Sequence, residues 1–320
     1  MSISRKNDVY GLFDETRVPT LELVYSDEGT VAVHCPHRIL ITGAAGQLGR
    51  ELQLAIAKRP DISADYADKN ILDIADADQV NNFLNGKNYT HIINCAAYTA
   101  VDRAEKEPET CAKVNVLGAK NLSEAIKGTG TRLIHISTDF VFDGEKRQPY
   151  TETDNPHPLS VYGNTKLAGE KEILTNSPDA IIIRTGWLYS TFGRNFVKTI
   201  IEKAKAGQPL TVVDDQIGTP TYAADLAQVI LDIIELKKWI PGVYHFSNAG
   251  ETSWFGFAEA ILNLSSIDTS LKPCATGDYP ALATRPAYAV LDKSKITETF
   301  GISLVDWHKS LAKCIESLSK

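Results

Sequence analysis

The sequence lacks long apolar runs, and this absence excludes membrane proteins. In its 320 residues no uninterrupted apolar stretch approaches the roughly twenty residues that a membrane-spanning helix needs. The N-terminus also lacks the apolar core of a signal peptide. We therefore expect a cytoplasmic protein that is not embedded in a membrane.

Cysteine and histidine are present but not grouped. The five cysteines are odd in number and widely scattered, with no C-x-x-C pair (Cys35, Cys95, Cys111, Cys274, Cys314). Such spacing argues against a disulfide framework and against a zinc site, and it favours buried or free thiols. The seven histidines form no cluster either, so no metal site is predicted.

The sequence has fewer basic than acidic residues. The 33 Lys and Arg residues are outnumbered by 40 Asp and Glu residues, giving a formal net charge of −7. Nucleic-acid binding through phosphate contacts needs a basic face, so that class of partner is excluded, and binding to an anionic membrane surface is disfavoured. The remaining composition is that of a globular protein with one large domain or two modest ones.

From Arg38 onward, short apolar runs alternate with helical patterns. Strands are predicted at 38–42, 91–95, 132–137 and 180–185, each rich in Ile, Leu or Val. Helices are predicted at 46–58, 111–127, 161–174 and 222–237. This alternation indicates an α/β fold, a Rossmann-like doubly wound parallel sheet. We expect residues 38–186 to form mainly the NAD(P)-binding part, and residues 187–320 mainly a smaller substrate-binding part with segments that return to the sheet.

Residues 1–37 do not fit this repeat. The stretch 20–35 contains two β-prone runs on either side of "SDEG", which is typical of a β-hairpin. The sequence does not assign a role to this N-terminal extension.

A glycine-rich turn stands between the first predicted strand and the first helix. "ILITGAAGQLGREL" places Gly43, Gly46 and Gly49 there. In dinucleotide-binding folds the first glycine allows a tight turn, the second lets backbone approach a pyrophosphate, and the third lets the helix pack on the strand. An ordinary strand–helix turn is the alternative, but the position at the start of a βαβ series favours dinucleotide binding.

A carboxylate that holds the adenosine ribose is expected about twenty residues further on. Asp65 and Asp68 are candidates, and Asp68 has the better separation. Lys69 or Arg50 would suit the additional phosphate of NADP, so the choice between NADPH and NADH stays open.

Tyr162 and Lys166 are four residues apart on a predicted helix, and therefore lie on one face of it. Ketone reduction needs an acid at the carbonyl oxygen, and an ammonium beside a phenol lowers the phenol's pKa toward the range where it exchanges protons. Two such residues also occur at this spacing by chance. Ser137, Thr138 and Asp139, which end a predicted parallel strand, add hydroxyls and a carboxylate where ligands bind in such sheets.

Several motifs, in this order, resemble the dTDP-4-dehydrorhamnose reductase family of the extended short-chain dehydrogenase/reductase superfamily. They include "TGAAGQLGREL", "NCAAYTAVDRAEKEPE", "STDFVFDG", "PLSVYGNTKLAGE" and "TRPAYAVLD", and the resemblance covers about residues 38–318. It implies reduction of the C4 keto group of dTDP-4-dehydro-L-rhamnose by NADPH or NADH, giving dTDP-L-rhamnose for cell-surface polysaccharide.

The resemblance also implies roles for individual residues. Tyr162 would donate the proton, Lys166 would hold the nicotinamide ribose and tune the phenol, and Thr138 would hydrogen-bond the substrate oxygen. The cofactor would further contact Gly43, Gln47 and Leu48 at the pyrophosphate, Asp73 and Ile74 at the adenine, and Ala96, Ala97 and Tyr98 at the nicotinamide. The sugar nucleotide would contact Val101, Asp139, Phe140, Trp187 and, through its diphosphate, Arg285.

Two positions depart from the family pattern. Phe140 stands where the family usually has tyrosine, so a hydroxyl contact to the sugar is lost while aromatic packing is kept. Some members bridge a dimer with Mg²⁺. Glu51 matches one such position, but "KAKAGQPL" has no acidic residue at another, so a homodimer is possible and a metal-bridged one is not supported.

Two other functions compete with reduction. An epimerase or dehydratase would keep NAD⁺ bound and return the hydride to the same sugar, and a dehydratase would need a carboxylate pair where "STDF" supplies only Asp139. A non-catalytic regulatory subunit of the same fold is the second alternative. The intact set of Thr138, Tyr162 and Lys166 argues against it.

Overall fold

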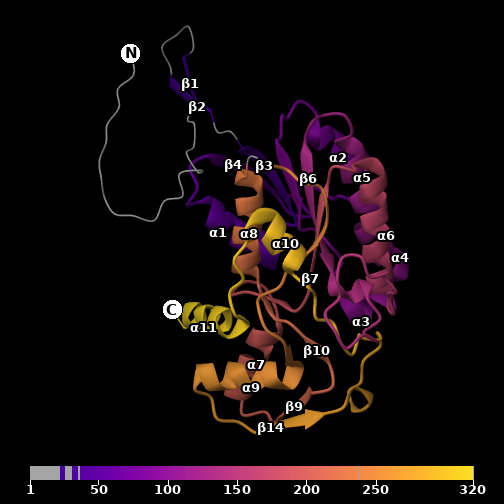
Figure 1. Ribbon diagram of the computed structural model, residues 1–320, viewed down its shortest axis with the longest axis vertical. Coiled ribbons are helices and arrows are strands. Elements are labelled where there is room, and N and C mark those ends of the chain that lie inside the picture. Colours follow the sequence, from indigo (N-terminus) through magenta and orange to yellow (C-terminus); the bar gives the residue numbers. More distant parts are fainter. Residues whose placement is uncertain (1–21, 26–30, 35–36, 237, 320) are drawn as a thin grey trace, which may run out of the picture.

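A parallel sheet of six strands forms the centre of the protein in the computed structural model, which describes residues 22–25, 31–34, 37–236 and 238–319 (Figure 1). The strands lie in the order β12-β7-β6-β5-β3-β4. Their bounds are β3 His37–Thr42, β4 Ile62–Ala67, β5 His91–Asn94, β6 Arg132–Thr138, β7 Ile181–Thr185 and β12 Gly242–His245. Because β3 lies between β4 and β5, the strand order reverses there, and ligands bind at such a switch point.

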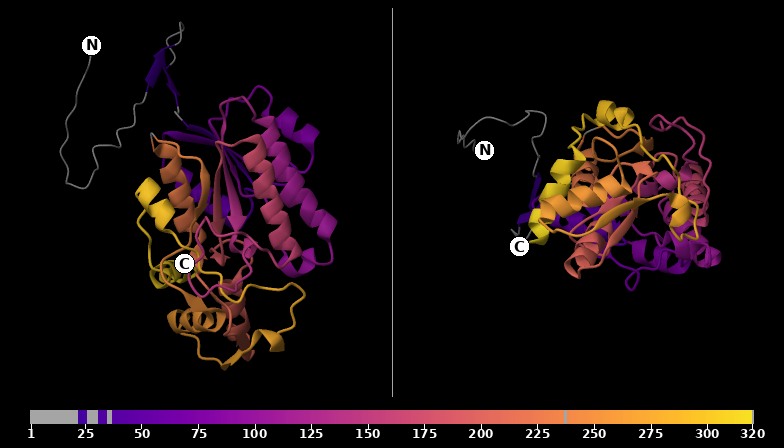
Figure 2. Two further views of the ribbon diagram at one scale, coloured as in Figure 1. Left: turned by 45° about the vertical axis from the view of Figure 1, so that its right-hand side comes forward. Right: turned by 90° about the horizontal axis from the view of Figure 1, so that it is seen from below.

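Helices cover both faces of this sheet, as Figures 1 and 2 show. Ile39 and Ile41 of β3 point into a core shared with α1 (Gln47–Ile56), α8 (Ala223–Glu235) and α10 (Ser294–Phe300). Leu40, between them, points into the opposite core with α2 (Ala77–Leu84), α5 (Gly118–Ala125) and α6 (Val161–Asn176). Since successive side chains of a strand point to opposite faces, a continuous apolar run is buried on both.

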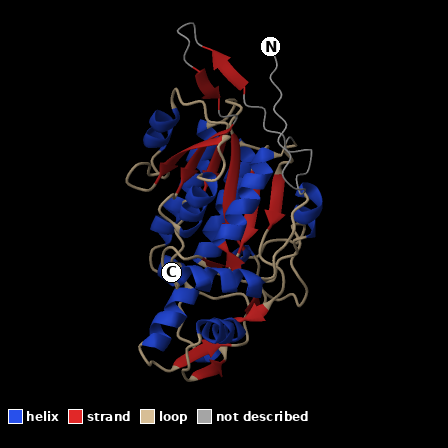
Figure 3. Ribbon diagram, turned by 90° about the vertical axis from the view of Figure 1, so that its left-hand side faces the viewer, coloured by secondary structure: helices blue, strands red, loops and turns tan. Residues whose placement is uncertain are grey.

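The C-terminal lobe has a core of its own at the carboxyl ends of the strands (Figure 3). Its helices are α7 (Phe196–Lys205), α9 (Trp254–Ser265) and α11 (Trp307–Leu318). Short strands complete it: β8 Leu188–Tyr189 with β11 Thr221–Tyr222, β9 Leu210–Val213 with β14 Leu271–Cys274, and β10 Ile217–Gly218 with β13 Thr252–Ser253. The lobe and the sheet therefore enclose the edge where the predicted site residues lie.

The predicted α/β fold is confirmed, with two local differences. The expected helix at 111–127 is divided into α4 (Pro108–Ala112), a π-helical segment at Lys113–Leu117, and α5. Strand β4 was not predicted, because it lies at the sheet edge and its sequence "ISADYA" is only partly buried. An edge strand does not need the continuous apolar run by which the other strands were recognised.

In the N-terminal extension, β1 (Glu22–Tyr25) pairs antiparallel with β2 (Val31–His34). These are the two runs of the predicted hairpin, while its turn, at 26–30, lies outside the described residues. Within the part of the chain that the structure describes, no helix is long and apolar enough to cross a membrane.

The turn from β3 into α1 depends on close backbone contacts. Gly43 has a φ of +65°, and a Cβ there would lie 2.6 Å from the backbone nitrogen of Ala96, after β5. A Cβ on Gly49 would lie 2.6 Å from the Cα of Ala44. Both distances are far below a van der Waals contact. Glycine at these two positions is what lets α1 begin directly at the switch point.

We predict that Gly43→Ala destabilises the protein more than Gly207→Ala does. Gly207 has a φ of +67°, and a Cβ added there would have no atom within 4 Å, so its substitution costs only left-handed strain, about 1–2 kcal/mol. At Gly43 the overlap with Ala96 adds roughly 1–3 kcal/mol. Urea unfolding of both variants measures the difference, and equal losses of unfolding free energy would contradict this account.

Candidate active site

The N-terminus of α1 offers an anion-binding site at the switch point. Gly46 is the N-cap residue, no side chain caps the helix, and no acidic residue stands in its first turn. The first backbone N–H groups of α1 are therefore available to phosphate oxygens. Gln47 accepts a hydrogen bond from Asn195 of the C-terminal lobe at 3.0 Å, and Leu48 is buried beneath the turn.

Three other predicted cofactor residues follow β4. The Asp68 carboxylate accepts hydrogen bonds from the backbone N–H groups of Asn70 and Ile71, and Asp73 accepts one from Ala75. The Ile74 side chain is 3% exposed and belongs to the core. Asp68 and Asp73 thus lie in partly exposed loops beside the turn, whereas Ile74 is buried and its carbonyl accepts a hydrogen bond from Asn121.

The predicted acid, Tyr162, lies in the first turn of α6. Ser160 caps this helix by accepting a hydrogen bond from Gly163 N. The Thr138 side chain, at the end of β6, lies within hydrogen-bonding range of the Tyr162 phenol. Burial raises the pKa of Tyr162 above its usual value, while the Thr138 hydroxyl opposes this shift. The structure therefore brings two of the three predicted catalytic residues side by side.

Lys166 lies one turn further along α6 and is 2% exposed. Its Nζ donates to the carbonyl of Ile136 at 2.6 Å and lies 3.2 Å from His135 Nε2, both on β6. Burial lowers the pKa of Lys166 to about 8, while Glu170 on the same helix acts in the opposite direction. The amine is thus held against the strand that carries Thr138.

Asp139 adds a carboxyl group next to Thr138. Thr138 Oγ1 donates to Asp139 Oδ1 at 3.0 Å, and burial raises the pKa of Asp139 to about 7. Since a hydroxyl has one proton, Thr138 must turn away from Asp139 before it donates to a substrate oxygen. The neighbouring Phe140 ring meets the Tyr162 ring edge-on at 5.5 Å, so the expected aromatic packing is present.

Comparison with known proteins identifies the family of this chain. The family profile described as RmlD substrate binding domain matches residues 37–320. A dTDP-4-dehydrorhamnose reductase of Aggregatibacter actinomycetemcomitans is 43% identical over 286 residues, which cover 86% of this chain and 97% of the relative. The chain belongs to the dTDP-4-dehydrorhamnose reductase family. The predicted family resemblance is confirmed.

Solved structures of this family superpose closely. The dTDP-4-dehydrorhamnose reductase of Clostridium acetobutylicum has a TM-score of 0.85 at 42% identity and covers 88% of this chain and 100% of its own. That of Bacillus anthracis, solved in complex with NADP, also has a TM-score of 0.85, at 37% identity over 88% of this chain and 99% of its own.

Asn115 is a site residue that the sequence did not reveal. It lies in the π-helical segment and is 2% exposed. Its side chain accepts from Tyr98 N at 2.8 Å and donates to Tyr98 O and to Thr165 Oγ1, so it fixes the loop Ala96–Ala97–Tyr98 after β5. A Cβ on Gly169 would overlap Asn115 O, so this glycine allows α6 to approach the segment. π-helical turns often mark functional sites, but no sequence pattern identified this one.

The predicted sugar-nucleotide residues lie toward the C-terminal lobe. Trp187, just beyond β7, has a φ of +50° and stacks on Trp254 with ring centroids 3.5 Å apart. A bulky residue in this backbone region is strained, and such strain occurs at functional sites. Trp254 and Arg285 both line a cavity of about 500 Å³ between α7, β9 and the loop before Arg285.

Arg285 is already paired in the structure. Its guanidinium forms two hydrogen bonds with the Asp102 carboxylate, at 3.0 and 2.7 Å, next to the predicted substrate residue Val101. Asp102 also accepts from the backbone N–H groups of Leu282 and Ala283. Short helix α3 (Val101–Ala104) is thereby joined to the C-terminal lobe. A diphosphate that binds Arg285 has to share it with Asp102.

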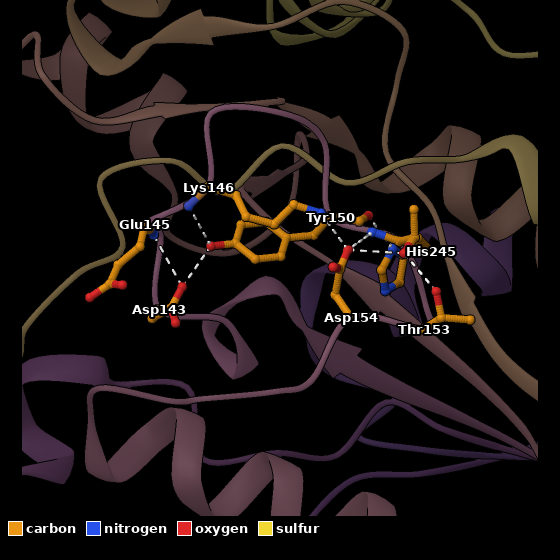
Figure 4. A network of polar contacts seen from close by, with 8 residues as sticks. Asp143, Glu145, Lys146, Tyr150, Thr153, Asp154 and His245 are labelled. Atoms are coloured by element: carbon orange, nitrogen blue, oxygen red, sulfur yellow. Dashed lines mark hydrogen bonds and ion pairs between the residues drawn. The ribbon is translucent and has the colours of Figure 1, made fainter.

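The loop between Asp139 and Tyr162 is held by the polar network in Figure 4. The Tyr150 hydroxyl donates to Asp143 at 2.7 Å, and Lys146 forms an ion pair with Asp154 at 2.7 Å. His245, at the end of β12, donates from Nδ1 to the Tyr150 carbonyl at 3.0 Å. This network ties the loop between β6 and α6 to the end of β12.

Glu51, the sequence candidate for a Mg²⁺ ligand, is hydrogen-bonded within the chain. Glu51 is 5% exposed and accepts a hydrogen bond from Ser190. Among residues 37–236 and 238–319 and the two hairpin strands, no group of three or more His, Cys, Asp or Glu side chains is placed to hold a metal ion.

A buried ion pair joins α6 to β7 next to Lys166. Glu170, one turn after Lys166, forms two hydrogen bonds with Arg184 of β7, at 2.9 and 2.6 Å, and also accepts one from Ser137. The side chains of Arg184 and Glu170 are 5% and 3% exposed. This explains the position of Ser137, which points to Glu170 and leaves Thr138 as the hydroxyl beside Tyr162.

We predict that Glu170→Gln lowers the free energy of unfolding by about 3–5 kcal/mol, because it leaves the buried Arg184 charge uncompensated. Glu124→Gln is the matched control. Its partner Lys120 lies 3.7 Å away, both side chains are exposed, and we expect a loss below about 0.5 kcal/mol. Urea titration of both variants provides the measurement. A loss at Glu170 as small as the control's would show that the pair is not needed.

Proposed function

We propose that this protein reduces the C4 keto group of dTDP-4-dehydro-L-rhamnose, giving dTDP-L-rhamnose, with NADPH or NADH as the reductant. The observation that carries the proposal is the position of Tyr162, in the first turn of α6, beside Thr138 at the end of β6, with Lys166 buried one turn further along the helix. Membership of the dTDP-4-dehydrorhamnose reductase family supports the choice of substrate.

The chain fits a nicotinamide dinucleotide. A Cβ at Gly43 would overlap the backbone of Ala96, so glycine is needed for the tight turn that precedes α1. The N-terminus of α1 has no side-chain cap, which leaves its N–H groups for the pyrophosphate. Ala96, Ala97 and Tyr98 would line the nicotinamide side, and Asp68 or Asp73 would lie toward the adenosine. The bound cofactor supplies the hydride, which the residues of this chain cannot.

The chain's own part in the reaction is to deliver a proton. As negative charge develops on the C4 oxygen, the Tyr162 phenol donates its proton to that oxygen. The phenolate left on Tyr162 is stabilised by the Thr138 hydroxyl and by a proton on Lys166. Burial strengthens both interactions, because it removes water that would screen them.

Sugar-nucleotide binding is assigned to the lobe side of the site. Trp187, stacked on Trp254, offers an aromatic surface, and Arg285 offers a guanidinium to the diphosphate. The cavity that Trp254 and Arg285 line then receives the nucleoside part.

We predict that Tyr162→Phe lowers kcat by about 10²–10⁴-fold, because the general acid is lost, and leaves NADPH binding within a few-fold of the wild type. Tyr244→Phe is the control. Tyr244 lies on the edge strand β12 and its hydroxyl donates to the Ile240 carbonyl at 3.0 Å, so no predicted catalytic or cofactor residue loses a partner, and we expect wild-type turnover. The assay follows NADPH or NADH oxidation with dTDP-4-dehydro-L-rhamnose.

The same assay separates the competing functions. Net oxidation of added NADPH with stoichiometric formation of dTDP-L-rhamnose supports a reductase, since an epimerase or dehydratase that recycles bound NAD consumes no external reductant. Absence of turnover with either cofactor would refute the proposed reaction, and unchanged turnover in Tyr162→Phe would refute the role of that residue.

A further inference from the structure

A chain of buried hydrogen bonds runs from Lys166 into the sheet. Lys166 Nζ lies 3.2 Å from His135 Nε2, and His135 Nδ1 lies 2.9 Å from Asn94 Nδ2 on the neighbouring strand β5. Asn94 Oδ1 accepts from Thr42 Oγ1 at 2.7 Å and from Ala96 N at 3.1 Å. The side chains of Asn94 and His135 are each 1% exposed. Each contact in the chain therefore constrains the next.

The backbone at Ala96 determines the direction of this chain. A backbone N–H can only donate, so the Asn94 atom that it meets must be the amide oxygen, and the atom facing His135 must be the NH₂ group. His135 Nδ1 then accepts from Asn94, and the imidazole carries its proton on Nε2. Burial also lowers the pKa of His135 well below its usual value, so the ring is neutral.

The His135 tautomer affects the protonation of Lys166. An Nε2–H group pointing at Nζ needs a lone pair there, and an ammonium group has none. We infer that Asn94 holds His135 as the Nε2–H tautomer, and that His135 thereby favours the neutral amine of Lys166 over its ammonium form. Asn94 and His135 are thus positioning residues that act on the proposed reduction through Lys166, so this inference rests on the role proposed for that residue.

Other groups that face Lys166 also favour or disfavour its ammonium form. Glu170 on α6, Cys111 on α4 and Cys95 after β5 favour the ammonium form, and burial opposes them. The Glu170 charge is already matched by Arg184 at 2.6 Å. The contact with His135 adds a further preference for the amine. Tyr162, facing the same site, is a neutral phenol at rest, because its pKa is raised by burial.

The preference for the amine opposes the charge that stabilises the phenolate. The ammonium form of Lys166 cannot accept a hydrogen bond from His135 Nε2–H, so it must leave that contact. The amine keeps the contact and avoids the cost of a buried, poorly solvated ammonium. The His135 tautomer therefore lowers the pH above which the ammonium is lost.

Nitrogen NMR of the histidine side chains in the free, full-length protein tests the tautomer directly. We expect His135 to be protonated at Nε2. His245 is an internal control with the opposite tautomer, because its Nδ1 faces the Tyr150 carbonyl at 3.0 Å and must carry the proton. A His135 spectrum with the proton on Nδ1, or on both nitrogens near pH 7, would overturn the inference.

The variant Asn94→Asp reverses the direction of the hydrogen-bond chain and keeps the shape of the side chain at position 94. A carboxylate still accepts from Thr42 and Ala96, but it also accepts from His135 Nδ1–H, so Nε2 becomes an acceptor for the Lys166 ammonium. We expect the His135 tautomer to switch, that of His245 to stay, and the Lys166 titration midpoint to rise by about one pH unit or more. Lys166→Arg identifies the lysine signal.

The pH dependence of turnover provides the kinetic readout. If the Lys166 ammonium stabilises the phenolate, kcat/KM falls as pH rises through the lysine pKa, and Asn94→Asp moves this fall to higher pH. A Lys166 midpoint that does not move in a folded Asn94→Asp protein would refute the coupling. Both NMR measurements use the enzyme without substrate, so failure of the proposed reaction is seen separately, as absence of turnover with a correct tautomer. Should Asn94→Asp not fold, the wild-type His135 tautomer alone decides.

Discussion

The contact of the Lys166 amine with strand β6 is the interaction on which the rest of the site depends. It joins α6 to the sheet by the 2.6 Å hydrogen bond to Ile136 O, and it places Tyr162 one helical turn away, against Thr138. An amine this deeply buried is costly unless its hydrogen bonds are made. The sheet therefore supplies a carbonyl and an imidazole, and neighbouring Glu170 is neutralised by Arg184.

Glycine residues make the other close approaches possible. Gly43 lets the turn after β3 contact Ala96, and Gly169 lets α6 contact the π-helical segment that carries Asn115. Gly163 serves α6 in the same way, because a Cβ there would overlap Phe140 O. In each case two backbones meet at a point where side chains of the site must converge, and any larger residue would separate them.

The sequence predicted most of the fold, since buried parallel strands need continuous apolar runs and the covering helices need a repeating apolar face. It did not predict β4, whose edge position requires neither. Tyr162 and Lys166 were found because their chemistry demands a spacing of one helical turn. Asn94, Asn115 and His135 carry no such local pattern, because each acts across the sheet or between helices on residues 17 to 41 positions away.

By itself the sequence determined the order of strands and helices, the glycine turn, the phenol–amine pair and the hydroxyl at the end of β6, because each is a local property of spacing and residue type. Only the tertiary structure decided which groups meet. It paired Arg285 with Asp102, directed Ser137 to Glu170, and set the Asn94–His135–Lys166 chain in one direction. The physical reason is that a hydrogen bond's direction depends on what every partner beyond it donates or accepts, and those partners come together only when the sheet is formed.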